Sequence, residues 1–211
     1  EFRRVLFRSK VSSESSVNYG FSVEVLGGGV AAAFSGPAGA FDAAASNFPS
    51  SVALSDGGTT AKLTKKGAYA ILGQPIGSSG SVSFELVKDD KDDEASCFGV
   101  MSEAQLSSLP TALHEHDAPS GSAYIRCYNG RVRDSDHSKE DSSCKVHPGG
   151  TLRIEVEDGT ATFFVNGKKH PHIAKGIRGP VRGFFFRYAS SRDVTAKCTS
   201  LSLPQAAASG S

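Results

Sequence analysis

The sequence predicts an all-β protein, an antiparallel β-sandwich. Short runs alternate apolar and polar residues with the period of two that a half-buried strand shows. Asp-Gly and Asn-Gly pairs, which favour tight turns, separate several of these runs. Only residues 102–113 leave room for a short helical turn. Many short strands joined by turns are typical of a sandwich or barrel.

The clearest element spans 151–168, with a turn at 158–159. The apolar residues before and after the turn share one phase, and charged residues occupy the other. We therefore predict an antiparallel hairpin with a polar outer face. The residues expected to point inward are Leu152, Ile154 and Val156, together with one or both of Phe163 and Val165.

The remaining predicted strands share this pattern and cover 50–55, 68–72, 81–87, 97–101, 123–128, 131–133, 183–188 and 194–201. Asn129-Gly130, between two of them, is the strongest local hairpin signal. We assign all strands to one domain over 41–204. Because each strand carries one polar face, we expect both sheets to be solvated on their outer sides.

The two ends of the chain lie outside this predicted domain. RRVLFRS is what a common sequencing adaptor encodes in translation, so we interpret 1–9 as an artefact and the chain as a fragment. Residues 10–40 are rich in Gly, Ala and Ser and are expected to be flexible, and 205–211 to form a disordered tail. Without the arginines of 1–9 there is no basic excess, which argues against nucleic acid as a partner.

The four cysteines are far apart and contain no C-x-x-C pair: Cys97, Cys127, Cys144 and Cys198. No secretory signal and no apolar run of about 18 residues is present. We therefore expect free thiols, a cytoplasmic location and no membrane partner.

Several motifs occur in a fixed order: DDKDDEASCFGV at 89–100, YNG at 128–130, KVHPGGTLRIEVED at 145–158, TFFVNGK at 162–168 and YASSRDV at 188–194. In this order they resemble the SPRY domain, and most closely the SPRY-like domains of large HECT and RING ubiquitin ligases. The resemblance implies a concanavalin A-like sandwich. It also implies a non-catalytic protein-interaction module that recruits a partner or substrate.

The sequence departs from that family at a few positions. The chain has no Trp; Phe84 and Tyr124 stand where the family commonly has one. Gly150 replaces an Asp, and Arg187 replaces an aromatic residue. A binding site built on Trp would therefore be lost or different here.

The family grips peptides with inter-strand loops at one edge of the sandwich. Tyr128, Arg131 and Arg133 flank such a loop, and Tyr and Arg are frequent interface anchors. We predict that these three residues bind a protein or a short peptide segment, without a cofactor.

Other chemistries have weaker support. Glu155 and Glu157, about 7 Å apart on one strand face, suggest a glucanase-type carboxylate pair, but they suit a solvated face better. The acidic run 89–94 and the H-x-H pairs at 114–116 and 170–172 lack full calcium or zinc ligand sets. We expect no enzyme and no metal site; the alternative is a lectin-like carbohydrate-binding sandwich.

Overall fold

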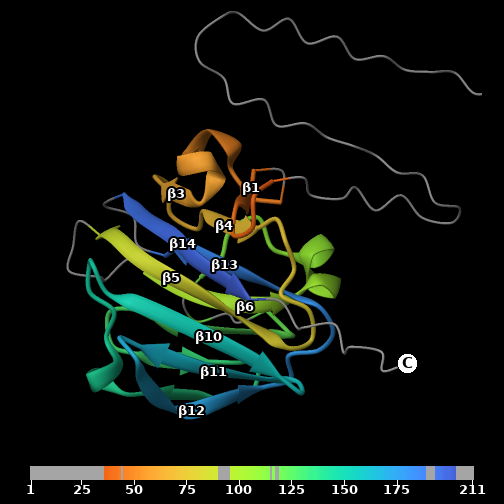
Figure 1. Cartoon of the computed structure of the whole chain (residues 1–211), viewed down its shortest axis with the longest axis vertical. Coiled ribbons are helices and arrows are strands. Elements are labelled where there is room, and N and C mark those ends of the chain that lie inside the picture. The colour runs from red at the N-terminus through yellow and green to blue at the C-terminus, as the bar shows by residue number, and fades with distance from the viewer. Residues whose placement is uncertain are drawn as a thin grey trace, which may run out of the picture. The chain divides into compact units, whose positions relative to one another are not determined.

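The structure is a computed structural model that describes residues 36–43, 45–89, 96–114, 116, 119–188 and 193–202. Our predictions for 1–9, for most of 10–40 and for 205–211 concern residues outside these ranges. Two antiparallel sheets of seven strands each pack face to face (Figure 1). The predicted β-sandwich is thereby confirmed.

The first sheet has the strand order β1 (Phe41–Asp42), β4 (Tyr69–Leu72), β13 (Val181–Arg187), β6 (Ser96–Ser102), β7 (Ser122–Arg126), β8 (Arg131–Arg133), β9 (Ser138–Glu140). The second sheet has the order β12 (Lys168–Lys175), β11 (Thr160–Val165), β10 (Thr151–Glu157), β5 (Gly80–Asp89), β14 (Val194–Ser202), β3 (Thr60–Leu63), β2 (Val52–Ser55). Four short 3-10 turns are described: η1 (Pro49–Ser51), η2 (Asp56–Gly58), η3 (Glu103–Ser108) and η4 (Ser142–Cys144). The third lies within 102–113, where a helical turn was expected.

The hairpin of β10 and β11 has the predicted register. Ile154 faces Phe163 across the pair, and Leu152 faces Val165. All five side chains predicted to point inward are buried. The alternation of the sequence therefore located both the turn and the buried face.

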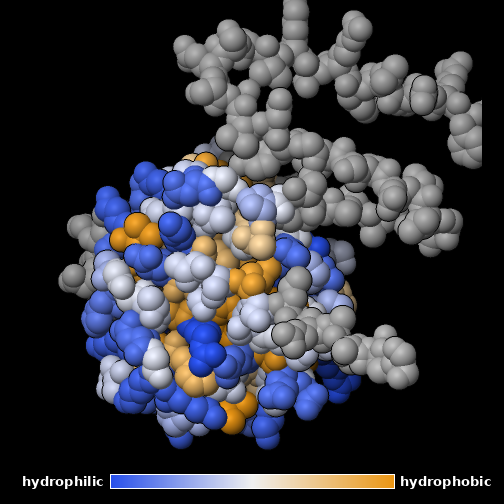
Figure 2. Space-filling model, in the orientation of Figure 1, coloured by the Kyte–Doolittle hydropathy of each residue, from blue (hydrophilic) through white to orange (hydrophobic). Residues whose placement is uncertain are grey.

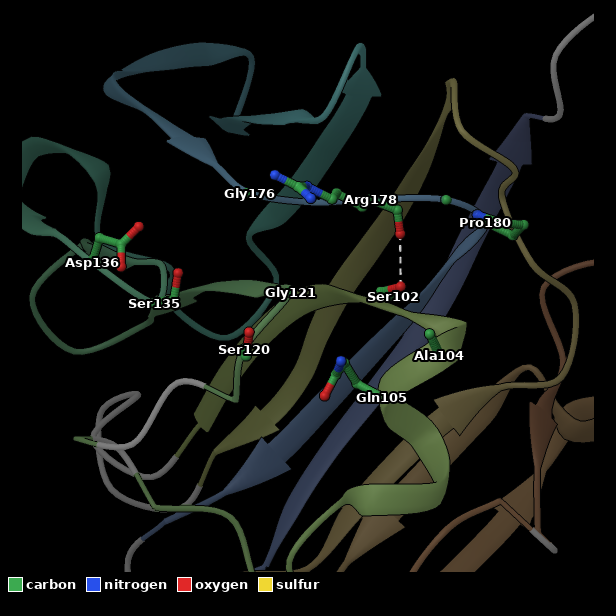
Figure 3. A pocket seen from close by; sticks show the side chains of 11 residues that line it. Ser102, Ala104, Gln105, Ser120, Gly121, Ser135, Asp136, Gly176, Arg178 and Pro180 are labelled. Carbon is green, nitrogen blue, oxygen red and sulfur yellow. Dashed lines mark hydrogen bonds between the residues drawn. The ribbon is translucent and has the colours of Figure 1, made fainter.

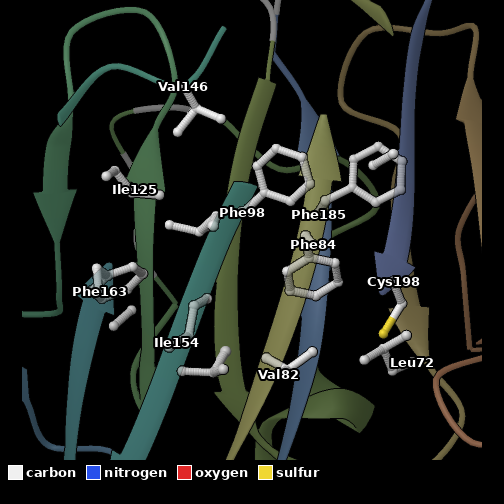
Figure 4. Close-up of a cluster of buried hydrophobic side chains, with 14 of the residues drawn as sticks. Leu72, Val82, Phe84, Phe98, Ile125, Val146, Ile154, Phe163, Phe185 and Cys198 are labelled. Atoms are coloured by element: carbon white, nitrogen blue, oxygen red, sulfur yellow. The ribbon is translucent and has the colours of Figure 1, made fainter. Parts of the chain in front are cut away.

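The core lies between the sheets and is rich in Phe (Figure 4). Phe98 packs on Phe84 and on Phe185, with ring centroids 5.4 and 5.6 Å apart. Phe84 thus fills a core position where the family commonly has Trp. The four cysteines are buried free thiols, and burial raises the pKa of Cys198 to about 12.

The outer faces of the two sheets differ. In the second sheet β10 and β11 alternate buried and more exposed residues, as predicted. In the first sheet β4 and β6 are buried along their whole length, so the expected solvated face is wrong there. η3 and the residues that follow it supply the cover, because Leu113 is buried in a second apolar cluster and Leu106 and Leu109 pack against it. The strand members of this cluster are Tyr69, Ile71, Cys97, Met101, Tyr124, Phe184 and Phe186.

Some element boundaries differ from those predicted. β7 ends at Arg126 and not at Tyr128, because the run continues as a turn whose Cys127 is buried. β12 was missed: it is charged and contains Pro171, which a strand at the edge of a sheet tolerates. Ala40, at the end of the segment expected to be flexible, is buried. In the described part of the chain, no helix has the length and apolarity needed to cross a bilayer.

Candidate partner-binding site

The predicted site lies at the turn between β7 and β8. Ile125 pairs with Val132 and Arg126 with Arg131, so residues 127–130 form the turn. The connection is thus a four-residue turn and not a two-residue Asn-Gly hairpin. Gly130 has a φ of +65°, and its N–H donates to the Arg126 carbonyl at 2.9 Å.

The turn is held from several sides. The Asn129 side chain accepts a hydrogen bond from the Arg131 N–H at 3.2 Å and donates one to Glu140 at 2.8 Å. The Arg131 guanidinium binds the same Glu140 oxygen at 2.6 Å. A Cβ atom at Gly130 would come within 2.8 Å of the Cys144 backbone, so the turn packs directly against η4. These contacts fix the backbone from which Tyr128 projects.

Tyr128 is the exposed member of the turn, with 41% of its surface accessible. The Arg126 guanidinium lies over its ring at 5.6 Å from the centroid, and the Lys145 ammonium at 5.3 Å. Arg126 also lies 4.9 Å from the centre of the Tyr188 ring, and its Nε donates to the Tyr188 hydroxyl at 3.0 Å. We call Tyr188, Arg126, Tyr128 and Lys145 the tyrosine–cation row.

The three predicted residues are not equivalent. Arg131 is half-buried and engaged by Glu140, so it supports the turn. Arg133 lies two residues further along β8, with Nη1 3.3 Å from His116 Nδ1. Tyr128 lies within the turn and Arg131 directly follows it, whereas Arg133 is about 7 Å further along the strand. Sequence reasoning missed Arg126 and Lys145; only Arg126, two residues before Tyr128, carried a local signal.

A polar network lies beneath this site and joins β12, the edge strand of the second sheet, to the residues at both ends of β8. His170 on β12 is fully buried; its Nε2 donates to the Gly130 carbonyl at 2.9 Å, and its Nδ1 accepts the His172 N–H. His172 Nε2 in turn lies 3.3 Å from the Asp134 carboxylate. Burial is the largest cause of the lowered pKa of His170.

Asp134 directly follows β8 and takes part in the same network. Burial by itself raises its pKa, but hydrogen bonds from the N–H groups of His137, Asp136 and Lys175 and from His172 hold the pKa below the ordinary value. The H-x-H pair of β12 is therefore used in hydrogen bonding. Among the described residues, no group of three or more His, Cys, Asp or Glu side chains is placed to hold a metal ion.

The carboxylates considered for glycosidase chemistry lie on the outer face of the second sheet. Glu155 forms an ion pair with Arg153 from the same strand face. Arg153 also covers the ring of Phe164 at 4.3 Å. Figure 2 shows this face with mostly hydrophilic residues along its margin and hydrophobic residues toward its middle.

A groove of about 700 Å³ lies at the opposite end of β6 and β7 from Tyr128. Loops from four connections line it, and Ser102 donates to the Arg178 carbonyl across one side at 2.6 Å (Figure 3). The charged side chains of its lining are Asp136 and Arg178. The row and the groove are thus separate features, about 15–20 Å apart along the strands.

Neither a family model nor a curated protein matches this chain. Among solved structures, the SPRY domain of human HERC1 aligns with 75% of this chain and 96% of its own, at 18% identity and a TM-score of 0.60. The TRIM65 PSpry domain aligns with 76% and 88%, at 13% identity and a TM-score of 0.54. The NEUZ (NHR) domain of Neuralized from Drosophila melanogaster aligns with 75% and 89%, at 15% identity and a TM-score of 0.50. This chain therefore has the fold of a SPRY domain, as its motifs suggested.

Proposed function

We propose that this chain is a non-catalytic protein-interaction module that binds a protein or a short peptide segment at the Tyr128 turn. The observation that carries the proposal is Tyr128 itself, a large aromatic side chain 41% exposed on a turn held by Asn129, Arg131 and Glu140. A side chain on a fixed backbone loses little entropy on binding, which favours an anchor role. Arg131 is a positioning residue in this scheme, and Arg133 extends the contact along β8.

The cellular context is part of the same proposal. SPRY-like domains of large ubiquitin ligases supply the motifs that this chain resembles, and the SPRY fold supports a protein partner in general. We extend the proposal to a cytoplasmic domain that recruits a partner or substrate for ubiquitination. Any ligase activity would belong to other domains.

A pull-down with quantitative mass spectrometry tests the site. The bait is the full chain as wild type, as Tyr128→Ala with Arg133→Ala, and as Glu155→Gln with Glu157→Gln. We expect the first variant to lose specific partners and the second to keep them, because removing an anchor costs on the order of 2 kcal/mol or more. Both variants must melt like wild type. Retention in the first variant and loss in the second would refute the assignment.

A glycan array and a β-glucan hydrolysis assay test the alternatives. We expect neither binding nor turnover by the wild-type chain. Hydrolysis that disappears in the Glu155→Gln, Glu157→Gln variant would overturn the non-catalytic assignment. Glycan binding that survives Tyr128→Ala would favour a lectin-like role on another surface.

A further inference from the structure

In the described part of the chain the two sheets have four edge strands, and β2 differs from the other three. β12 carries Pro171 and three lysines, and β9 has the charged sequence SKE. β1 has only two residues. Charge, proline and very short length are devices that keep an edge strand from pairing with another chain. The four residues of β2, VALS, contain neither a charge nor a proline.

The main-chain groups of β2 alternate between its neighbour β3 and the outer edge of the sheet. The Thr64 N–H donates to the Ser51 carbonyl at 3.0 Å, which sets the phase of the ladder between β2 and β3. Because bonded and non-bonded pairs alternate along an antiparallel ladder, Val52 and Leu54 direct their N–H and C=O groups away from β3. Among the described residues, no group is hydrogen-bonded to the Leu54 N–H, the Leu54 carbonyl or the Val52 carbonyl. β2 therefore presents unpaired donors and acceptors at its outer edge.

The side chains of β2 suit an apolar, uncharged neighbour. Val52 and Leu54 are partly buried and pack against the main core. Ala53 points to the opposite, exposed face. Lys62, which lies opposite Ala53 on β3, is paired with Asp193 at 2.7 Å. A strand added to this edge would therefore extend the cover of Val52 and Leu54, and would meet a small side chain on the exposed face.

We infer that β2 binds β2 of a second copy of this chain, so that the second sheets of both copies join into one continuous antiparallel sheet. A two-fold axis at Ala53 places Val52 of each copy opposite Leu54 of the other copy. In this register each Leu54 N–H reaches a Val52 carbonyl, and each Leu54 carbonyl faces a Val52 N–H, so the outward groups of both strands are used.

The pattern of β2 is self-complementary, which favours a second copy over an unrelated strand. A two-fold interface requires that the same surface fits itself. Ala53 of the two copies would form a non-hydrogen-bonded pair, in which the Cα atoms approach to about 4.5 Å. The small side chain of Ala53 permits that approach, and no like charges meet across the axis.

The dimer should be weak and should leave the Tyr128 turn uncovered. Four residues per copy bury less than the roughly 1,200 Å² at the lower limit of stable interfaces. β12, at the other edge of the same sheet, contacts the Tyr128 turn through His170. A dimer would thus present two such turns, and the inference does not depend on the function proposed for them.

Sedimentation velocity of the full chain, from about 10 µM to about 1 mM, tests the inference. We expect the weight-average sedimentation coefficient to rise from the monomer value toward the dimer value. Ala53→Lys and Ala53→Glu each place like charges opposite one another across the axis, and each should weaken dimerisation about tenfold or more. An equimolar mixture of the two variants should form a heterodimer, because opposite charges then face each other.

The other edge of the same sheet offers a matched control. Ile173 is 40% exposed on β12, so Ile173→Lys adds a similar charge at a distant edge strand and should leave the dimerisation constant within about twofold. Hydrogen exchange of the wild-type chain gives a readout that needs no substitution. The Leu54 amide should become more protected as the protein concentration rises.

Each contrary outcome overturns the inference. A chain that stays monomeric up to about 1 mM has no such interface. A dimer that neither Ala53→Lys nor Ala53→Glu weakens, or that Ile173→Lys weakens as much, pairs through another surface. Loss of dimer in both Ala53 variants without recovery in their mixture, or a Leu54 amide whose exchange does not depend on concentration, excludes the two-fold pairing at Ala53.

Discussion

The two sheets of the sandwich share one core and differ on their outer faces. On the second sheet, outward side chains such as Arg153 and Glu155 meet solvent. On the first sheet, outward side chains such as Tyr124 and Phe186 pack against each other, with ring centroids 5.1 Å apart. Residues 106–113 cover this layer of side chains. The first sheet is thus the middle layer of a three-layer arrangement, and the second sheet is an outer layer.

This difference explains for which strands the sequence pattern predicted the buried and the exposed face. A strand with one solvated face must alternate, so the turn between β10 and β11 and the buried face of this hairpin were predicted. A strand buried on both faces has no reason to alternate, and β6 reads as the compact run SCFGVMS. Gly99 in that run leaves space for side chains of the two neighbouring strands, because a Cβ atom there would come within 2.7 Å of Tyr124 on β7 and 2.8 Å of Phe184 on β13. A continuous apolar strand is therefore a signal that another segment covers the sheet.

We expect the largest loss of stability from a substitution in the core between the two sheets. Ile154 is fully buried between them, so Ile154→Asp leaves an unpaired charge in the core and should unfold the domain. Circular dichroism at 25 °C would show loss of the β-sheet signal and of the cooperative melt. Ile154→Val keeps the shape and should cost only about 0.5–1.5 kcal/mol. A folded Ile154→Asp protein would contradict the shared core.

A pair of Phe substitutions compares the two outer faces directly. Phe186 is 1% exposed on the first sheet, whereas Phe164 is partly exposed on the second sheet, where Arg153 lies over its ring. Phe186→Ala should cost about 3–5 kcal/mol of unfolding free energy, and Phe164→Ala about 1 kcal/mol. Urea titrations with equal m-values would measure both. Equal losses would show that the outer faces are alike.

The free energy of unfolding should depend on pH through His170, where β12 contacts the turn before β8. His170 of β12 bonds the Gly130 carbonyl through Nε2 and accepts the His172 N–H at Nδ1, which requires the neutral ring. Burial lowers its folded pKa below the ordinary 6.5, while the His172 and Asp141 charges act in opposite directions. The unfolded chain then binds the proton first as pH falls through 6.5, so stability is full above that pH and declines below it.

The midpoint of urea unfolding, measured from pH 8 to pH 5, tests this pH dependence. Wild type should lose stability below pH 6.5, and His170→Gln, which cannot titrate, should show a flatter profile from a lower starting value. An identical slope in the variant would assign the dependence to other groups.

The sequence did not predict which distant residues contact the Tyr128 turn. Tyr128 was found because Asn-Gly follows it, which is a local signal. Lys145, Glu140 and His170 are 17, 12 and 42 positions away from it in the sequence and reach the turn only through the packing of η4 and β12. Arg131 and Arg133 were chosen by residue type, and their partners Glu140 and His116 follow no periodic pattern. Contacts between loops depend on tertiary structure, so strand periodicity cannot predict them.

The smallest expected effect lies on the solvated face beside Ile154. Glu155 pairs with Arg153, and the two side chains are 40% and 47% exposed. Exposed ion pairs contribute little because water screens them and ordering both side chains costs entropy. Glu155→Lys should therefore change the unfolding free energy by about 0.5 kcal/mol or less, even with a new Lys beside Arg153. Glu155→Gln, which removes the charge without reversing it, should be indistinguishable from wild type in the same melt. If Glu155→Lys instead lowered stability as much as Phe186→Ala, the outer face of the second sheet would be as closely packed as that of the first, and the contrast between the sheets would fail.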